Sequence, residues 1–199
     1  MADEENYGYW SALGFFVGTK ICEERDVAVG IIGCYQGASM IESWVPAGTY
    51  QAAGGAVPDE VKYPDYDLFA QWNRDGRLYE SFLSRLAPFS LSSVVWYQGE
   101  SNCSTAGGAA YGAMLALLID IWRERFENKQ LPFAVVQIAD FVDRDTDGWH
   151  AIQQAQWDVQ FMREGVKTVI SADVCETDDI HPPTKHLLAD RIVRALDEI

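Results

Sequence analysis

The stretch AAYGAMLALLIDIWRERFENKQLPFAVVQIAD, residues 109–140, decides the fold class of this chain. Residues 109–126 carry apolar side chains at helical spacing and predict a long helix. The turn ENKQLP follows, and residues 133–140 form an apolar run that predicts a buried strand. A helix joined by a short turn to a largely apolar strand is typical of a parallel sheet covered by helices.

The same alternation extends along the rest of the chain. Further strands are predicted over 27–33, 92–100 and 167–173. Further helices are predicted over 9–25, 78–89, 149–163 and 184–199, the last one capped by Thr184 after two prolines. We therefore expect one α/β domain over residues 1–199, with an irregular insertion over 45–75 that is rich in Gly and Pro.

Length and charge exclude several classes of partner. The chain has 199 residues, which fits one domain with a proper core, and a formal net charge of -15. Such a charge disfavours nucleic acid and anionic membranes as partners and is compatible with a neutral sugar. No apolar run approaches the ~20 residues that a membrane span needs. Residues 1–10 lack the features of a secretory signal, so we expect a cytoplasmic protein if Met1 is the native start; localisation is otherwise open.

The cysteines and histidines do not predict a metal site or a cofactor. The four cysteines have no CxxC spacing, and the three histidines have no zincin spacing. We expect reduced thiols in or near strands and no bound metal.

Polar residues follow each predicted strand. The segments are GCYQGAS (33–39), YQGESN (97–102), DFVDRD (140–145) and DVCETDDIHPP (173–183). Because the carboxyl ends of parallel strands meet at one edge of the sheet, we expect these loops to converge there. Gly and Asn are also ordinary turn residues, which explains each loop singly but not the accumulation of polar groups at one edge.

The last of these loops contains a candidate base. His181 can accept a proton near neutral pH, and Asp178 could hold its ring tautomer by accepting the other N–H group. Asp179 competes with Asp178 for this role, and the plainer interpretation of the Asp-x-x-His pattern is a helix entry.

Two other loops contain candidate oxyanion donors. Gln98 and Glu100 flank Gly99 at a strand end and provide an amide donor and a carboxylate, and Gly37 could present a backbone N–H group to the same oxyanion. The alternatives are a buried polar turn at 98–100 and a plain strand-end turn at Gly37.

These motifs together resemble a known family. The segments 29–46, 94–102, 131–141, 149–156 and 178–192, in this order, are similar to the sialate O-acetylesterase and acetylxylan esterase family of SGNH hydrolases. The resemblance runs from about Tyr7 to the C-terminus, and WYQGESN and DDIHP are its most specific parts. It implies a three-layer flavodoxin-like fold and hydrolysis of acetyl esters on sugars of the sialic acid or xylan type by a Ser–His–Asp mechanism without metal.

The resemblance also assigns residues. It implies His181 as the base and Asp178 as the acid, with Gly37, Gln98, Glu100 and Asn102 in the oxyanion and substrate group. The second block of the family usually has Gly-Gly, and Ala38 replaces the second glycine here. Trp44 is expected to be a packing residue.

The nucleophile of the family lies in a Gly-Gln-Ser-Asn block after its first strand, and this block does not occur in the printed sequence. The nucleophile is therefore unknown, and Ser39 and Ser101 are weak candidates. Without that first strand, strands 27–33 and 94–100 would have to pair with each other, take a strand from another chain or expose an edge, and unpaired edges could join two copies into a homo-oligomer.

The leading hypothesis is thus a carbohydrate O-acetylesterase acting on an acetylated sugar or glycan, with turnover by this chain left open. The alternative is a non-catalytic protein that binds acetylated sugar. A third hypothesis places the native start upstream of Met1 and keeps the first function for the parent protein.

Overall fold

A parallel sheet forms the centre of the molecule, as the sequence predicts. The computed structural model describes residues 10–52, 71–87, 89–103, 105–144 and 146–199. Within these residues the sheet has three strands in the order β1-β2-β3, namely β1 (Val94–Tyr97), β2 (Phe133–Val136) and β3 (Val166–Val169). Val94 pairs with Phe133, and Phe133 pairs with Val166.

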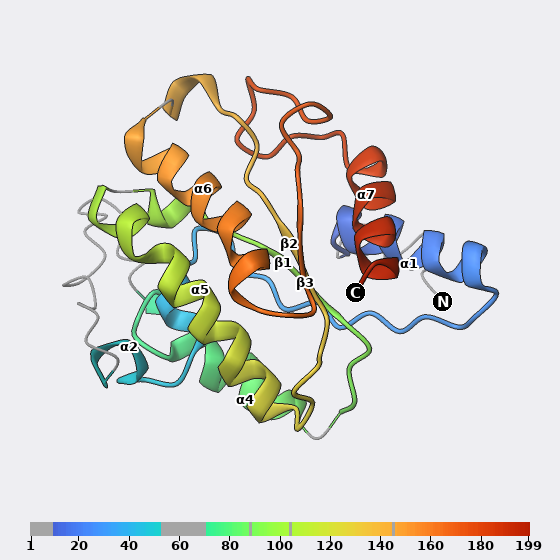
Figure 1. Cartoon of the computed structure of the whole chain (residues 1–199), viewed down its shortest axis with the longest axis horizontal. Helices are drawn as coiled ribbons and strands as arrows, with labels where there is room; N and C mark the ends of the chain where they lie inside the picture. Colours follow the sequence, from blue (N-terminus) through green and yellow to red (C-terminus); the bar gives the residue numbers. More distant parts are fainter. Residues whose placement is uncertain (1–9, 53–70, 88, 104, 145) are drawn as a thin grey trace.

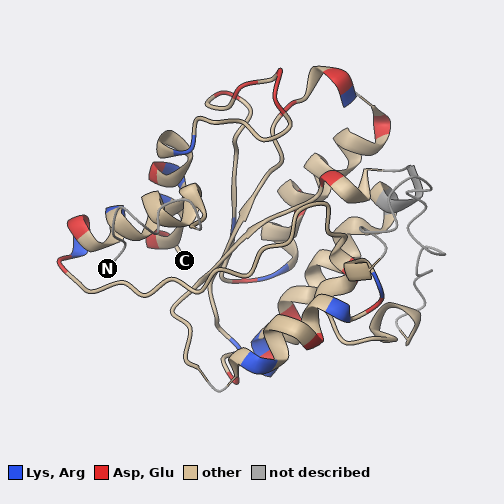
Figure 2. Cartoon of the chain, turned by 180° about the vertical axis from the view of Figure 1, so that it is seen from behind, with Lys and Arg blue, Asp and Glu red and all other residues tan. Residues whose placement is uncertain are grey.

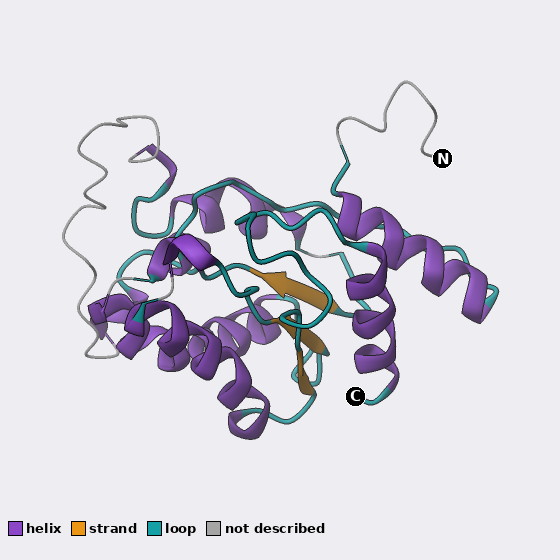
Figure 3. Cartoon of the chain, turned by 90° about the horizontal axis from the view of Figure 1, so that it is seen from above, coloured by secondary structure: helices purple, strands orange, loops and turns teal. Residues whose placement is uncertain are grey.

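Helices cover both faces of the sheet (Figure 1; from above in Figure 3). The helices α5 (Thr105–Arg125) and α6 (Asp147–Met162) contact each other and share a core with Trp96, Phe133 and Val135. The helices α1 (Ala12–Arg25) and α7 (His186–Asp197) pack together over the other face, where Ala134 and Val136 lie. Two helical layers around a sheet confirm the predicted α/β fold class.

The remaining elements are short. They are η2 (Ile41–Trp44), α2 (Thr49–Ala52), η3 (Tyr79–Leu83), α4 (Ser84–Leu86), η4 (Glu100–Asn102) and η5 (Val142–Arg144). The helix predicted over 78–89 is thus divided into a π-helical turn, η3, and the short α4. In the expected insertion over 45–75 the structure shows α2, and residues 53–70 lie outside the described part. The one-domain organisation stays a prediction.

A cluster of tryptophans fills the core beneath α5. Trp44 and Trp122 each meet Trp96 edge-on, with ring centroids 6.2 and 5.6 Å apart respectively. Trp44 is 3% exposed and its indole N–H donates to Ser39 Oγ. These contacts confirm that Trp44 is a packing residue; burial of an aromatic side chain of this size contributes on the order of 2–3 kcal/mol.

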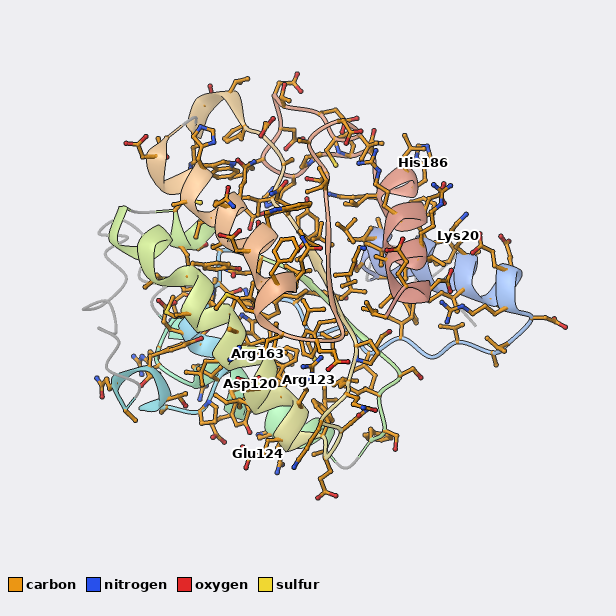
Figure 4. All side chains as sticks on the ribbon, in the orientation of Figure 1. Lys20, Asp120, Arg123, Glu124, Arg163 and His186 are labelled. Atoms are coloured by element: carbon orange, nitrogen blue, oxygen red, sulfur yellow. The ribbon has the colours of Figure 1, made fainter. Side chains whose placement is uncertain are left out.

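Ion pairs join the helices within each layer. Arg163, just after α6, binds Asp120 of α5 through two hydrogen bonds of 2.8 and 2.7 Å (Figure 4). On the other face, Lys20 of α1 lies 2.8 Å from Asp190 of α7. Because solvent screens these partly exposed pairs, their contribution to stability is small.

The predicted strand over 27–33 does not form. These residues belong to no strand and run as a long segment between α1 and η2 (Figure 1). Val27 and Ile32 are 47% and 46% exposed. The apolar run predicted burial, but a strand also needs a neighbour that accepts its hydrogen bonds, and within the described residues β1 pairs only with β2. The strand prediction is therefore wrong for this structure.

Candidate active site

The loops that follow the strands occupy the carboxyl edge of the sheet. The turn η4 comes almost directly after β1, η5 follows β2, and residues 170–185 follow β3. Figure 1 shows the loops after β2 and β3 together at the top of the sheet. Figure 2 shows stretches of acidic residues along this edge. The parallel sheet therefore brings together the segments that the sequence singles out.

Gln98 lies at the end of β1 and is 8% exposed. Its Nε2 donates to the carbonyl oxygen of Ser39 and to Asn102 Oδ1, both at 2.9 Å. Its Oε1 accepts from the hydroxyl of Tyr111 on α5. Both amide hydrogens are thus engaged. The Gln98 side chain can donate to an oxyanion only by exchanging one of these partners.

Asn102 is completely buried at the end of η4. Its Oδ1 accepts from the Ile41 N–H group, and its Nδ2 donates to Glu42 Oε2 at 3.0 Å. Burial raises the pKa of Glu42, and the Asn102 hydrogen bond acts in the opposite direction. Asn102 therefore ties the loop after β1 to η2, and it does not face the solvent from which a substrate would enter.

Gly99 lies against α6. A Cβ atom at this position would lie 2.7 Å from Ile152 Cγ2. Next to it, Gln156 of α6 donates to the Gln98 carbonyl oxygen at 2.7 Å and accepts from the Ile138 N–H group at 2.9 Å. This position requires glycine because a helix approaches the backbone there, and Gln156 links the ends of β1 and β2.

Gly37 has open surroundings. A Cβ atom there would meet no heavy atom within 4 Å. The next residue, Ala38, has a φ of 54°, in the left-handed region that favours glycine. Ala38 replaces the second glycine that the family resemblance leads one to expect, so the substitution carries backbone strain.

Asn73 is a site residue that the sequence analysis did not single out. Its Oδ1 accepts from the Met40 N–H group, and its Nδ2 donates to the Ala38 carbonyl oxygen, both at 2.7 Å. Nothing in the stretch WNRDG (72–76) marks this asparagine, because ordinary turns have the same composition.

Glu100 lies close to the candidate base. Burial raises the pKa of its carboxyl group, and the positive charges of His181 and Lys185 act in the opposite direction. Lys185 Nζ lies 5.2 Å from the centre of the Tyr97 ring, and burial lowers the pKa of this amine. Through these influences on Glu100, the loop after β3 affects a carboxyl group in the loop after β1.

The two aspartates near His181 differ in their contacts. Asp179 Oδ1 accepts from the His181 backbone N–H group at 2.7 Å and closes the turn. Asp178 is exposed, and within the described part of the chain its carboxylate makes no hydrogen bond with the imidazole of His181. An Asp178–His181 hydrogen bond would need a different side-chain orientation from the one in this structure.

Glu176 and Thr184 close the loop that carries His181. Glu176 accepts from both the N–H group and the hydroxyl of Thr184, which is eight residues away. These hydrogen bonds lower the pKa of Glu176. The predicted helix cap at Thr184 is wrong, because α7 begins at His186 with Lys185 at its N-cap. The Thr184 hydroxyl instead donates to Glu176 and so joins the two ends of the loop that carries His181.

The candidate nucleophiles make no hydrogen bond with His181 within the described residues. Ser39 is 6% exposed, and Ser101 is half-buried in η4. Within the described residues, neither hydroxyl is hydrogen-bonded to the His181 ring. Burial raises the pKa of the Cys34, Cys103 and Cys175 thiols, for Cys103 to about 12. These three thiols are therefore protonated at neutral pH and poorly nucleophilic.

The described residues contain neither a metal-binding cluster nor a helix that could span a membrane. They contain no group of three or more His, Cys, Asp or Glu side chains arranged to hold a metal ion. None of the helices that the structure describes has both the length and the apolar character needed to cross a membrane.

Known proteins with similar sequences include mammalian sialate O-acetylesterases. The human sialate O-acetylesterase is 26% identical over 204 residues, which cover 94% of this chain and 38% of the relative. The mouse sialate O-acetylesterase is 23% identical and covers 94% of this chain and 42% of the relative. The chain therefore spans about two fifths of the length of these relatives.

Solved structures agree with the fold. A carbohydrate acetylesterase from Xanthomonas citri superposes with a TM-score of 0.83 at 27% identity, over 98% of this chain and 42% of that one. A protein from Arabidopsis thaliana superposes with a TM-score of 0.64 at 19% identity, over 94% of this chain and 67% of that one, and shows similarity of fold. The family described as carbohydrate esterase, sialic acid-specific acetylesterase, matches residues 67–195, which is more than half of the chain. The chain therefore belongs to this family of carbohydrate esterases.

Proposed function

We propose that this chain carries the base and the oxyanion loops of a carbohydrate O-acetylesterase. The observation that carries the proposal is the family match over residues 67–195, which includes η4 and the His181 loop. The parallel sheet supports it, because it places both of these segments at one edge.

In the proposed reaction a serine hydroxyl attacks the acetyl carbonyl carbon while His181 accepts its proton. The backbone N–H group of Gly37 stabilises the oxyanion, and Gln98 joins it after exchanging one of its two amide partners. Collapse of the intermediate breaks the ester bond, and the protonated His181 gives its proton to the departing sugar oxygen. Water then attacks the acetyl-enzyme with His181 as base, releasing acetate and restoring the serine. Asp178 turns toward His181 and orients its ring during this cycle.

The test is acetate release from O-acetylated sialic acid and from acetylated xylo-oligosaccharides. We expect His181→Ala to reduce the rate by roughly 10³-fold or more. His186→Ala is the matched control. His186 is the first residue of α7 (Figure 4) and its ring packs against Phe16, so this variant is expected to keep the wild-type rate. Equal rates in His181→Ala and the wild type would refute the assignment of the base.

A second candidate function is binding without turnover. It is favoured by the contacts of Ser39 and Ser101, neither of which is hydrogen-bonded to His181 in the described residues. In that case calorimetry detects saturable binding of an acetylated sugar while no acetate appears. Release of acetate that depends on His181 would exclude this alternative.

We also propose that the free edge of β1 associates with a second copy of the chain. Among the described strands β1 is an outer strand, and Val95 on it is 37% exposed. The exposed apolar residues of 27–33 add apolar surface that a second copy of the chain could cover. Solution scattering is expected to give a mass above that of one chain, and a monodisperse monomer would contradict this.

A further inference from the structure

The loop at 37–41 is held by side chains from two directions. From the sheet edge, Gln98 binds the Ser39 carbonyl oxygen and Asn102 binds the Ile41 N–H group. From the turn at 72–76, Asn73 binds the Ala38 carbonyl oxygen and the Met40 N–H group. Four consecutive residues of the loop, 38–41, therefore each have a backbone group bound by a carboxamide side chain.

The Asn73 carboxamide imitates a neighbouring strand. It accepts from the N–H group of one residue and donates to the carbonyl oxygen two residues earlier, and both distances are 2.7 Å. This is the pairing that the C=O and N–H groups of one residue make with a neighbouring parallel strand. Because both groups of the carboxamide are used, the position of Asn73 fixes residues 38–40 in orientation as well as in distance.

The turn that carries Asn73 is itself anchored. Asp75 Oδ2 accepts from the Gly48 N–H group at 2.7 Å, and the Gly76 N–H group donates to the Glu42 carbonyl oxygen at 3.3 Å. A Cβ atom at Gly76 would lie 2.5 Å from the Ala47 nitrogen, so the two segments are in close contact. The turn that carries Asn73 is thus itself hydrogen-bonded to Glu42 and Gly48, which follow the loop 37–41 in the sequence.

The loop needs this support because its conformation is strained. Ala38 has a φ of 54°, and a residue with a Cβ atom adopts this region only where its surroundings determine it. The Ala38 carbonyl oxygen is the group that Asn73 binds, and Gly37, the proposed oxyanion donor, comes immediately before it. Loss of the Asn73 hydrogen bonds would let the peptide groups around Ala38 turn and would carry the Gly37 N–H group out of position.

We propose that Asn73 is a positioning residue, which acts through the loop 37–41 to hold the Gly37 N–H group toward the ligand. The role in catalysis rests on the proposed acetylesterase function. The clamp itself, in contrast, can be tested without turnover.

The experiment compares Asn73→Ala, Asn73→Asp and the wild type by amide hydrogen exchange and by acetate release. Asn128→Ala is the matched control, since Asn128 makes a similar bond to the Gln130 N–H group in the turn between α5 and β2. We expect the Met40 amide to exchange roughly tenfold faster in Asn73→Ala, with the change confined to residues 37–41. In Asn73→Asp the acceptor for Met40 is kept but a carboxylate oxygen faces the Ala38 carbonyl oxygen, so Met40 exchange is expected to lie between the rates of the wild type and Asn73→Ala.

The kinetic arm separates positioning from simple stabilisation. With an active wild type, we expect kcat of Asn73→Ala to fall roughly 10- to 100-fold while KM changes little, since the misplaced N–H group acts on the oxyanion. Unchanged Met40 exchange, faster exchange throughout the chain, or an unchanged kcat would each overturn the proposal. If the wild type releases no acetate, the proposed function fails and exchange alone decides the clamp: a local increase at 37–41 supports it, and an unchanged rate at Met40 refutes it.

Discussion

Two glycines of the candidate site are present for different physical reasons. The backbone at Gly99 is in contact with α6, whereas Gly37 borders open space. A methyl group on Gly99 would collide with Ile152 of α6 at 2.7 Å and with Ile138 at 3.1 Å, so the helix or the strand end must move. A methyl group on Gly37 meets nothing, and only a bound ligand would encounter it.

We therefore predict opposite effects for a matched pair of substitutions. Gly99→Ala is expected to lower the free energy of unfolding by about 1–3 kcal/mol through overpacking. Gly37→Ala is expected to change it by less than about 0.5 kcal/mol and to reduce acetate release or sugar binding. Urea denaturation gives the first comparison. A Gly37→Ala protein that is stable and fully functional would show that this residue does not face the ligand.

Ala38 gives a second prediction at the scale of one residue. Its φ of 54° is strained for alanine by about 1–2 kcal/mol, and glycine removes that strain while losing more entropy on folding. Ala38→Gly is expected to raise the free energy of unfolding by about 0.5–1 kcal/mol. A loss of stability in urea would mean that the Ala38 methyl group contributes packing that outweighs the strain.

At the scale of the elements, the loop that carries His181 is closed by the Glu176–Thr184 hydrogen bonds. These bonds hold the pKa of Glu176 below its ordinary value of 4.5, so the ionised carboxylate is the form that the fold stabilises. The stabilisation that the ionised Glu176 gives to the fold is complete above pH 4.5. It is lost as the pH falls through the lower pKa that Glu176 has in the folded state.

Acid should therefore weaken the closure of this loop as Glu176 becomes protonated. We expect the Thr184 amide resonance to shift as Glu176 becomes protonated, with a midpoint below 4.5. Glu176→Gln keeps an acceptor but cannot titrate, and the shift is expected to disappear. A midpoint at or above the ordinary value in the wild type would argue against the closure of the loop by Glu176.

The elements also show what sequence patterns can predict. The alternation around 109–140 predicted α5 and β2 because helical spacing and apolar strands depend on local sequence. The strand at 27–33 and the Thr184 cap failed because each depends on a partner elsewhere: a neighbouring strand in one case and Glu176 in the other. The candidate site behaves in the same way. His181 and Gly37 could be named as candidates from the sequence, and their roles stay predictions. The hydrogen bonds of Gln98 to Ser39 and Tyr111, and those of Asn73 to the loop 37–41, exist only in the fold.

At the scale of the molecule, the net charge is -15, and exposed acidic residues also lie around the candidate site. The loops at this edge of the sheet carry the exposed acidic residues Asp140, Asp143, Asp178 and Asp179, and Figure 2 shows acidic stretches there. These charges repel an anionic sugar such as a sialic acid and leave a neutral acetylated sugar unaffected.

This charge predicts a difference between substrate classes. Raising the salt concentration from low to physiological ionic strength is expected to lower KM severalfold for O-acetylated sialic acid, because screening shortens the range of the repulsion. KM for a neutral acetylated xylo-oligosaccharide is expected to stay constant. The same salt response for both substrates would show that the acidic edge does not influence recognition.

The central claim is that the Gly37 loop, η4 and the His181 loop form one site for acetylated sugars at the carboxyl edge of the sheet. The most direct measurement is an NMR titration of the isotope-labelled chain with an O-acetylated sugar, because it detects binding with or without turnover. We predict saturable shifts of the Gly37, Gly99 and His181 amides with one common affinity. Absence of shifts, or shifts confined to the opposite edge around Gln130 and Gly165, would contradict the account.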